Sequence, residues 1–220
     1  MVDSFGINLI WLVPLAPLIG FVLITFVTYR SRMLSALTAI LSVAISFVLS
    51  LDVLRVILTH PEITMNNPLE KAVEWLKMNG LFIEMGALID PLTSIMLFVV
   101  TFISLLVVIY SVGYMADDSR FSRFFSFLCL FVFSMLGLVI SNNYFQMFVF
   151  WELVGLCSYL LIGFYFYKES ASDACKKAFI TNRVADFGFM IGVIILFIYF
   201  GTFNFGELAV AISNSQDLAL

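Results

Sequence analysis

Three ionisable residues lie inside long apolar segments of this 220-residue chain. Glu152 interrupts the run FVFWELVGLCSYLLIGFYF, and Arg183 and Asp186 lie in a second apolar run further along. A charged side chain at the centre of a membrane-spanning helix costs about 2.5 to 3.5 kcal/mol on insertion scales, so such residues are normally paired and functional. Arg183 and Asp186 are three positions apart, which places them on one helix face, where they can pair.

These three residues have the composition of a proton-binding site. One arginine cannot neutralise two carboxylates, so the cluster would carry one excess negative charge, which favours a bound proton or a second cation nearby. We therefore interpret Glu152, Arg183 and Asp186 as a site that takes up and releases a proton. The alternative is a static ionic clamp between two helices. Polar groups that could lead a proton to the site are Ser158, Tyr159, Lys176 and Lys177, although a tyrosine in a membrane helix often only packs.

The composition predicts an integral membrane protein. Hydrophobic residues make up 62% of the chain and charged residues only 12%, and the mean hydropathy is +1.08, which is outside the globular range. The runs are apolar on all sides, which excludes a β-barrel and predicts an all-α polytopic bundle in one transmembrane domain. Stretches long enough to cross about 30 Å of hydrocarbon are expected near residues 8–28, 33–58, 91–115, 121–141, 144–167 and 176–201.

Depth along these spans places the three charges in one layer. At 1.5 Å rise per residue, Glu152 would lie about 12 Å and Asp186 about 15 Å below the outer surface, with Arg183 at about 20 Å and within a side chain's reach. The fifth and sixth spans run in opposite directions, so the three residues should meet near the middle of the membrane.

The long polar segment 59–90 between the second and third spans is expected outside the membrane. Within it, VEWLKMNGLFIEMG has two short β-compatible runs around Asn79 and Gly80, a dipeptide typical of a tight hairpin turn. We expect a short external β-hairpin there. Pro14 and Pro17 are expected to kink the first span, and a loop with a short surface helix should follow Gly201.

The basic residues set the expected topology. Seven of the eleven lie in the loops 29–32, 116–123 and 168–177: Arg30, Arg32, Arg120, Arg123, Lys168, Lys176 and Lys177. By the positive-inside rule these loops face the cytoplasm, matrix or stroma, and the N-terminus is outside. We expect a multi-pass protein of a bacterial inner membrane, with an organelle inner membrane or a thylakoid membrane as alternatives.

Other chemistry has little support in the sequence. There is no phosphate-binding glycine loop, no nucleophile beside a base and no basic aromatic surface for nucleic acid. His60 is the only histidine, and Cys129, Cys157 and Cys175 are too far apart for a CxxC pair and suit apolar packing. The close glycine pair Gly188 and Gly192 suggests a helix contact. We expect no metal and no cofactor in this chain.

Three motifs resemble one family. FWELVGLCSYLLIGF around Glu152, IDPLTSIMLFVVTFISLLVVIYSVGYM at 89–115 and NRVADFGFMIG at 182–192 are similar to motifs of the antiporter-like membrane subunits of respiratory complex I. The resemblance runs from about residue 8 to 208 and is closest to the chain 5 (subunit L) family of NADH:quinone oxidoreductase. It implies a proton-translocating membrane-arm subunit, part of a translocase, with no redox centre of its own.

The resemblance also implies roles and partners. In the family the acid matched by Glu152 carries the proton and pairs with a lysine in a broken seventh helix, and the charges matched by Arg183 and Asp186 modulate that pair. NADH, FMN, iron–sulfur clusters and quinone belong to other membrane and peripheral subunits. Family members are much longer, so we expect this chain to be the N-terminal part of a larger subunit. Alternatives are the large subunit of a multi-subunit cation/proton antiporter, with the choice of proton or sodium open, or a structural fragment that does not pump.

Overall fold

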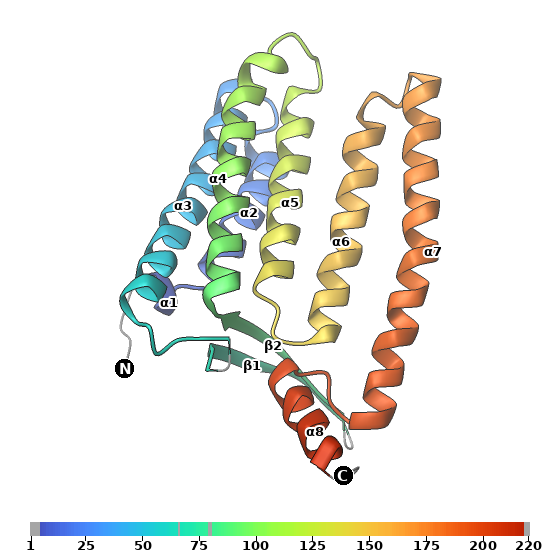
Figure 1. The fold of residues 1–220 in the computed structure, drawn as a ribbon. Helices are drawn as coiled ribbons and strands as arrows, with labels where there is room; N and C mark the ends of the chain where they lie inside the picture. Colours follow the sequence, from blue (N-terminus) through green and yellow to red (C-terminus); the bar gives the residue numbers. More distant parts are fainter. Residues whose placement is uncertain (1–4, 66, 79–80, 218–220) are drawn as a thin grey trace.

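The protein is a helical bundle with a β-hairpin across one end (Figure 1), as the sequence predicts. The computed structural model describes residues 5–65, 67–78 and 81–217. Within these residues five helices are long and apolar enough to cross a membrane, and the segment Leu12–Thr28 is a shorter apolar helix. The five are α3 (Arg32–Thr59), α4 (Pro91–Tyr114), α5 (Phe121–Val139), α6 (Tyr144–Ile162, extended to Tyr165 by a 3₁₀ turn) and α7 (Glu169–Phe200).

The first apolar segment is broken. Helix α1 (Phe5–Asn8) is separated from α2 (Leu12–Leu23), which continues as a π-helical turn over Ile24–Thr28. Pro17 lies inside α2 and has no N–H to donate to the carbonyl of Val13. The Ser46 hydroxyl of α3 donates to that carbonyl oxygen at 2.7 Å. A neighbouring helix thus satisfies the acceptor that proline leaves free, as apolar surroundings require.

Polar side chains directly before the first residue cap α4 and α6. The Asp90 carboxylate accepts the N–H of Thr93 at 2.7 Å, and Pro91 occupies the first turn of α4, where no N–H is needed. The Asn143 side chain accepts the N–H of Gln146 at 2.7 Å at the start of α6. Helix α7 ends at Gly201, whose φ of 72° is the left-handed conformation that favours glycine.

The core lies among α2, α3, α4 and α5. Val13, Val43, Leu97 and Phe125 are fully or almost fully buried there. Hydroxyl groups cross the same interfaces: Ser50 and Thr101 share a hydrogen bond of 2.8 Å, and the Ser35 hydroxyl donates to that of Ser122 at 2.9 Å. Such bonds tie membrane helices together, because lipid offers no alternative partner.

The hairpin consists of two antiparallel strands, β1 (Leu69–Met78) and β2 (Leu81–Ile89), with Leu69 opposite Ile89 and an irregularity between Glu74 and Leu76. The predicted Asn79–Gly80 turn lies outside the described residues. Helix α8 (Phe205–Asp217) follows α7 as the expected short surface helix, beside the hairpin and at the same end as α1 (Figure 1).

One sequence expectation about the α6–α7 connection is wrong. Lys176 and Lys177 were expected in a loop over 168–177, but α7 begins at Glu169 and both lysines lie within it. The segment is rich in good helix formers, and the Glu169 carboxylate in the first turn complements the positive end of the helix. The basic residues at this end of α7 are therefore held on a rigid helix.

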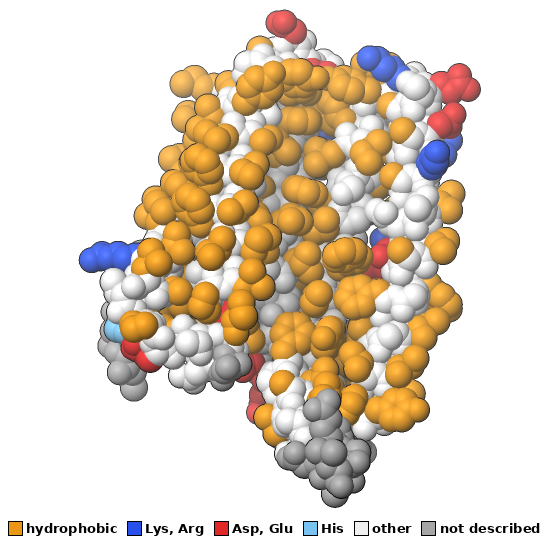
Figure 2. All heavy atoms as spheres, viewed as in Figure 1, with side chains coloured by type: hydrophobic (Ala, Val, Ile, Leu, Met, Phe, Trp, Pro, Cys, Tyr) orange, Lys and Arg blue, Asp and Glu red, His pale blue; other side chains and the backbone are white. Residues whose placement is uncertain are grey.

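Helices α6 and α7 form an open edge of the bundle. In their membrane windows 11% of the residues are buried, against 50% in α5, and apolar side chains cover the surface (Figure 2). Val184 and Ile198 of α7 are more than 70% exposed. A Cβ at Gly188 or Gly192 would meet no atom within 4 Å, so the glycine pair makes no close helix contact among the described residues. This face of α7 is free to receive another helix.

Candidate functional site

The structure brings the three membrane charges together between α6 and α7. The Arg183 guanidinium forms an ion pair with the Glu152 carboxylate through Nη1 and Oε2. Its Nε lies 3.8 Å from Oδ2 of Asp186, one turn along the same helix. One cation therefore lies between two carboxylates, the arrangement expected from their spacing and depth.

A fourth side chain completes the cluster. The indole N–H of Trp151 donates to Oδ1 of Asp186 at 2.9 Å, across the interface between α6 and α7. The Trp151 ring also packs edge-on against Phe189 of α7, with the centroids 6.0 Å apart. Sequence reasoning missed this residue because tryptophan counts as apolar in composition. Its position directly before Glu152 is the feature that could have identified it.

Arg183 favours one of its two acids in this structure. Its Nε is buried and has no hydrogen-bond partner among the described residues, because 3.8 Å to Asp186 exceeds hydrogen-bonding distance. The guanidinium also lies over the ring of Phe179, 4.7 Å from its centroid. Arg183 therefore pairs with Glu152 and lies beyond hydrogen-bonding distance of Asp186.

The cluster lies partly open on the outward edge of the bundle. The side chain of Asp186 is 5% exposed, whereas Glu152 is 23% and Arg183 36% exposed. Acidic and basic atoms are visible between α6 and α7 about halfway along their length (Figure 2). A charge exposed to lipid at this depth is unfavourable. The open side of Glu152 and Arg183 thus requires a covering segment.

The other candidate path residues separate into two groups. Tyr159 and Lys176 line a cavity of about 240 Å³ between α5, α6 and α7 at the basic end, together with Arg123. The Ser158 hydroxyl donates to the carbonyl of Val154, four residues earlier in α6, at 2.9 Å. Its proton is thus bound within its own helix. Lys177 is exposed on α7.

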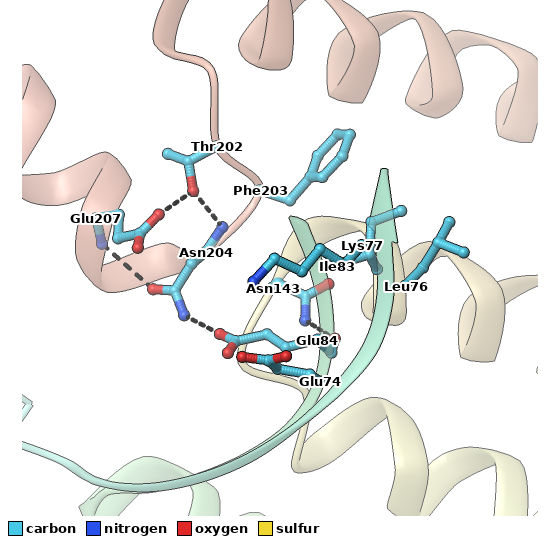
Figure 3. Close-up of a pocket in the computed structure, with 10 residues that line it drawn as sticks. All are labelled: Glu74, Leu76, Lys77, Ile83, Glu84, Asn143, Thr202, Phe203, Asn204 and Glu207. Carbon is cyan, nitrogen blue, oxygen red and sulfur yellow. Dashed lines mark hydrogen bonds between the residues drawn. The ribbon is translucent and has the colours of Figure 1, made fainter. Parts of the chain in front are cut away.

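A second polar cavity of about 240 Å³ lies at the hairpin end, and sequence reasoning missed it (Figure 3). Glu84 of β2 accepts hydrogen bonds from the side-chain amides of Asn142 and Asn204 at 3.0 and 2.8 Å. The same two amides bond Glu70 of β1. These contacts join the hairpin to the segment before α6 and to the segment after α7. The cavity therefore lies among contacts that connect the hairpin-side ends of α6 and α7 to the hairpin.

A polytopic helical bundle with charges paired halfway through its spans defines an antiporter-like membrane subunit. The chain matches the family model of NADH-Ubiquinone oxidoreductase (complex I), chain 5 N-terminus, over residues 75–125, and that of the NADH:quinone oxidoreductase/Mrp antiporter transmembrane region over 141–219. The chain belongs to this family of complex I chain 5 subunits, as its motifs indicated.

Curated relatives agree with this assignment. The chain is 46% identical over 202 residues to the chloroplast NAD(P)H-quinone oxidoreductase subunit 5 of Anthoceros angustus, an alignment that covers 90% of this chain and 27% of the relative. It is 43% identical to NAD(P)H-quinone oxidoreductase chain 5 of Synechocystis sp., with 91% of this chain and 30% of that protein covered. The chain thus spans less than a third of the length of these relatives.

The fold recurs in a solved membrane complex. The chain superposes with a TM-score of 0.76 and 17% identity on a chain of the membrane-bound sulfane sulfur reductase, an archaeal respiratory membrane complex, covering 90% of this chain and 39% of the other. At this identity the likeness shows the helical arrangement alone.

Proposed function

We propose that this chain contributes a proton-binding site to a proton-translocating membrane subunit of an NAD(P)H:quinone oxidoreductase complex. The observation that carries the proposal is the position of Arg183 between Glu152 and Asp186. The two relatives named above are subunits of NAD(P)H-quinone oxidoreductases. Quinone reduction elsewhere in the complex would drive the transport, so this chain acts as part of a translocase.

In this mechanism, protonation of Glu152 changes which carboxylate pairs with Arg183. With Glu152 ionised, Arg183 pairs with it and its Nε remains unsatisfied. When Glu152 takes up a proton its charge is lost, the ion pair weakens, and the guanidinium gains by closing on Asp186. The Trp151 N–H holds Asp186 in place for both states. Protonation of Glu152 is thereby coupled to the position of one guanidinium.

The open side of the cluster is the place for a further helix. Glu152 and Arg183 are partly exposed there. The family resemblance suggests that this helix supplies a lysine for Glu152. A second cation would relieve the excess negative charge and compete with the proton, so its movement would lower or raise the proton affinity of Glu152.

Protons would reach Glu152 from the basic end. The cavity lined by Tyr159 and Lys176 lies on the inner side of the cluster in the predicted topology, with the hairpin end outside. Among the described residues no group of three or more His, Cys, Asp or Glu side chains is placed to hold a metal ion. The family resemblance implies that NADH, FMN, iron–sulfur clusters and quinone would be bound by other membrane and peripheral subunits.

Glu152→Gln in the intact complex tests the proposal. Glutamine keeps the size of the side chain but cannot ionise, so proton transport into vesicles and the coupled quinone reduction should fall sharply while assembly persists. Glu169→Gln, an exposed acid at the start of α7, is the matched control. Unchanged transport in Glu152→Gln would contradict the role of Glu152 as the proton-binding group. Sodium-dependent transport without NAD(P)H oxidation would favour the cation/proton antiporter.

A further inference from the structure

An apolar groove runs between α3 and α4 at the basic end of the bundle. It encloses about 390 Å³. It opens on the lateral surface of the bundle, where Met33 is 74% and Leu37 43% exposed. Met33 and Ile40 mark its extent along α3, which corresponds to about 12 Å at 1.5 Å rise per residue. Because α3 and α4 are membrane helices, this surface faces lipid hydrocarbon.

One guanidinium lies at the mouth of the groove. Arg32, the first residue of α3, is the only charged residue among those that line it. Its Nη1 donates to the carbonyl oxygen of Ala116 at 2.7 Å, after the end of α4. A guanidinium has five N–H donors, so this bond fixes its position and leaves others for a ligand. Among the described residues that line the groove there is no carboxylate; Asp117, which follows Ala116, is not one of them.

The helix end strengthens the positive field at this mouth. Helix α3 has 28 residues and no acidic residue in its first turn, so its positive end is not compensated by a carboxylate of its own. The Ser31 hydroxyl accepts the N–H of Leu34 at 3.4 Å, and the other first N–H groups of a helix lack intrahelical acceptors and favour an anion. Arg32 and the helix end together favour a ligand whose negative group lies above an apolar chain.

We propose that the groove between α3 and α4 binds an anionic phospholipid, with the phosphate at Arg32 and one acyl chain along Met33, Leu37, Ile40 and Val112. Charge complementarity and the shape of the groove both favour this ligand. A basic pocket between membrane helices recognises the headgroup, and the apolar slot below it accepts the chain. A free phosphate would use Arg32 but leave the slot empty, so the lipid is the occupant that uses both. The proposal is independent of proton transport.

Photocrosslinking in the native membrane tests the lipid site. Membranes containing the full-length subunit are supplied with phosphatidylglycerol that carries a diazirine in one acyl chain, or with phosphatidylcholine labelled identically. After illumination, labelled peptides are mapped by mass spectrometry. Phosphatidylglycerol should label 33–40 and 112–121 several-fold more than phosphatidylcholine does. Equal labelling by the two lipids would overturn the proposal. Absence of label from both segments with both lipids would likewise overturn it.

Two variants and a control identify the residues. Arg32→Gln should lower phosphatidylglycerol labelling of these segments about tenfold, the loss expected for a charge-assisted hydrogen bond. Ala116→Leu narrows the groove while the Ala116 carbonyl and Arg32 remain, and it should lower labelling as well. Arg30→Gln removes a charge of the same loop that does not line the groove and should leave labelling unchanged. Wild-type labelling in both Arg32→Gln and Ala116→Leu would refute the assignment.

Discussion

Trp151 donates its indole N–H to the Asp186 carboxylate at 2.9 Å, and so links the residue before Glu152 to the helix that carries Arg183. Asp186 is the least exposed acid of the cluster, with 5% of its side chain accessible. Its position relative to Arg183 therefore depends on a neutral donor from the facing helix. This bond fixes the geometry of the site without adding charge.

Trp151→Phe should impair the site without removing any charge. A hydrogen bond to a charged group contributes about 1.5 to 3 kcal/mol, and without it Asp186 is free to approach Arg183 and draw it away from Glu152. Proton transport by the intact complex should fall while assembly persists, and the pH profile of transport should shift. Trp75→Phe, in the exposed part of β1, is the control. If the two variants behave alike, the indole N–H has no positioning role.

The layer of charges could be predicted from the sequence, but the contacts within it could not. Helical rise and antiparallel spans suffice to place Glu152, Arg183 and Asp186 at one depth. The preference of Arg183 for Glu152 depends on rotamers and on the Trp151 bond, which spacing does not specify. The positive charges of Lys176 and Lys177 predict a loop, but lysine is also a good helix former, and α7 begins before both residues, at Glu169.

Contacts between segments far apart in the chain could not be predicted from the sequence either. Ser46 satisfies the carbonyl that Pro17 leaves free, and this pairing needs the packing of α2 on α3 to be known. The hairpin could be predicted from alternation and a turn dipeptide, but its bonds to Asn142 and Asn204 could not. Those residues belong to connections far apart in the chain. Only the closed bundle brings them to Glu84.

Gly86→Ala should loosen the hairpin from α6. The backbone N–H of Gly86 donates to Oε1 of Gln146 at 2.8 Å, and Nε2 of Gln146 donates back to the Gly86 carbonyl at 3.0 Å. A Cβ at this position would lie 1.9 Å from Cγ of the fully buried Asn142, so that side chain must move. Overpacking of this kind costs about 1 to 3 kcal/mol. Hydrogen exchange at 141–146 and 202–208 should accelerate, and thermal stability should fall.

Gly113→Ala is the matched control for this substitution. Gly113 lies in α4, and a Cβ there would meet no atom within 4 Å. Alanine in a helix is favoured over glycine by up to about 1 kcal/mol, so stability should be unchanged or slightly raised. Equal stability of Gly86→Ala and Gly113→Ala would show that the close contact between Gly86 and Asn142 is not required.

A double-mutant cycle on Glu152 and Arg183 should show strong non-additivity. Arg183→Gln alone leaves two carboxylates in the span without their cation and should destabilise the protein by about 1 to 3 kcal/mol, less than for a fully buried pair because the arginine is partly exposed. Adding Glu152→Gln removes one of these charges, so the double variant should recover part of the loss. Thermal unfolding of the assembled complex measures all three variants. Additive losses would mean that the pair is not coupled.

Arg120 should control the rigidity of the connection between α6 and α7. Its guanidinium carbon lies 4.9 Å from the ring centroid of Phe164 and 5.1 Å from that of Tyr167, and Nε is 3.9 Å from Asp118. Cation–π contacts contribute about 0.5 to 2 kcal/mol, so Arg120→Ala should destabilise this end by about 1 to 2 kcal/mol. Hydrogen exchange over 163–168 should then rise. Arg30→Ala removes an exposed arginine at the same end and should leave exchange unchanged; equal exchange in both variants would contradict the role of the aromatic rings.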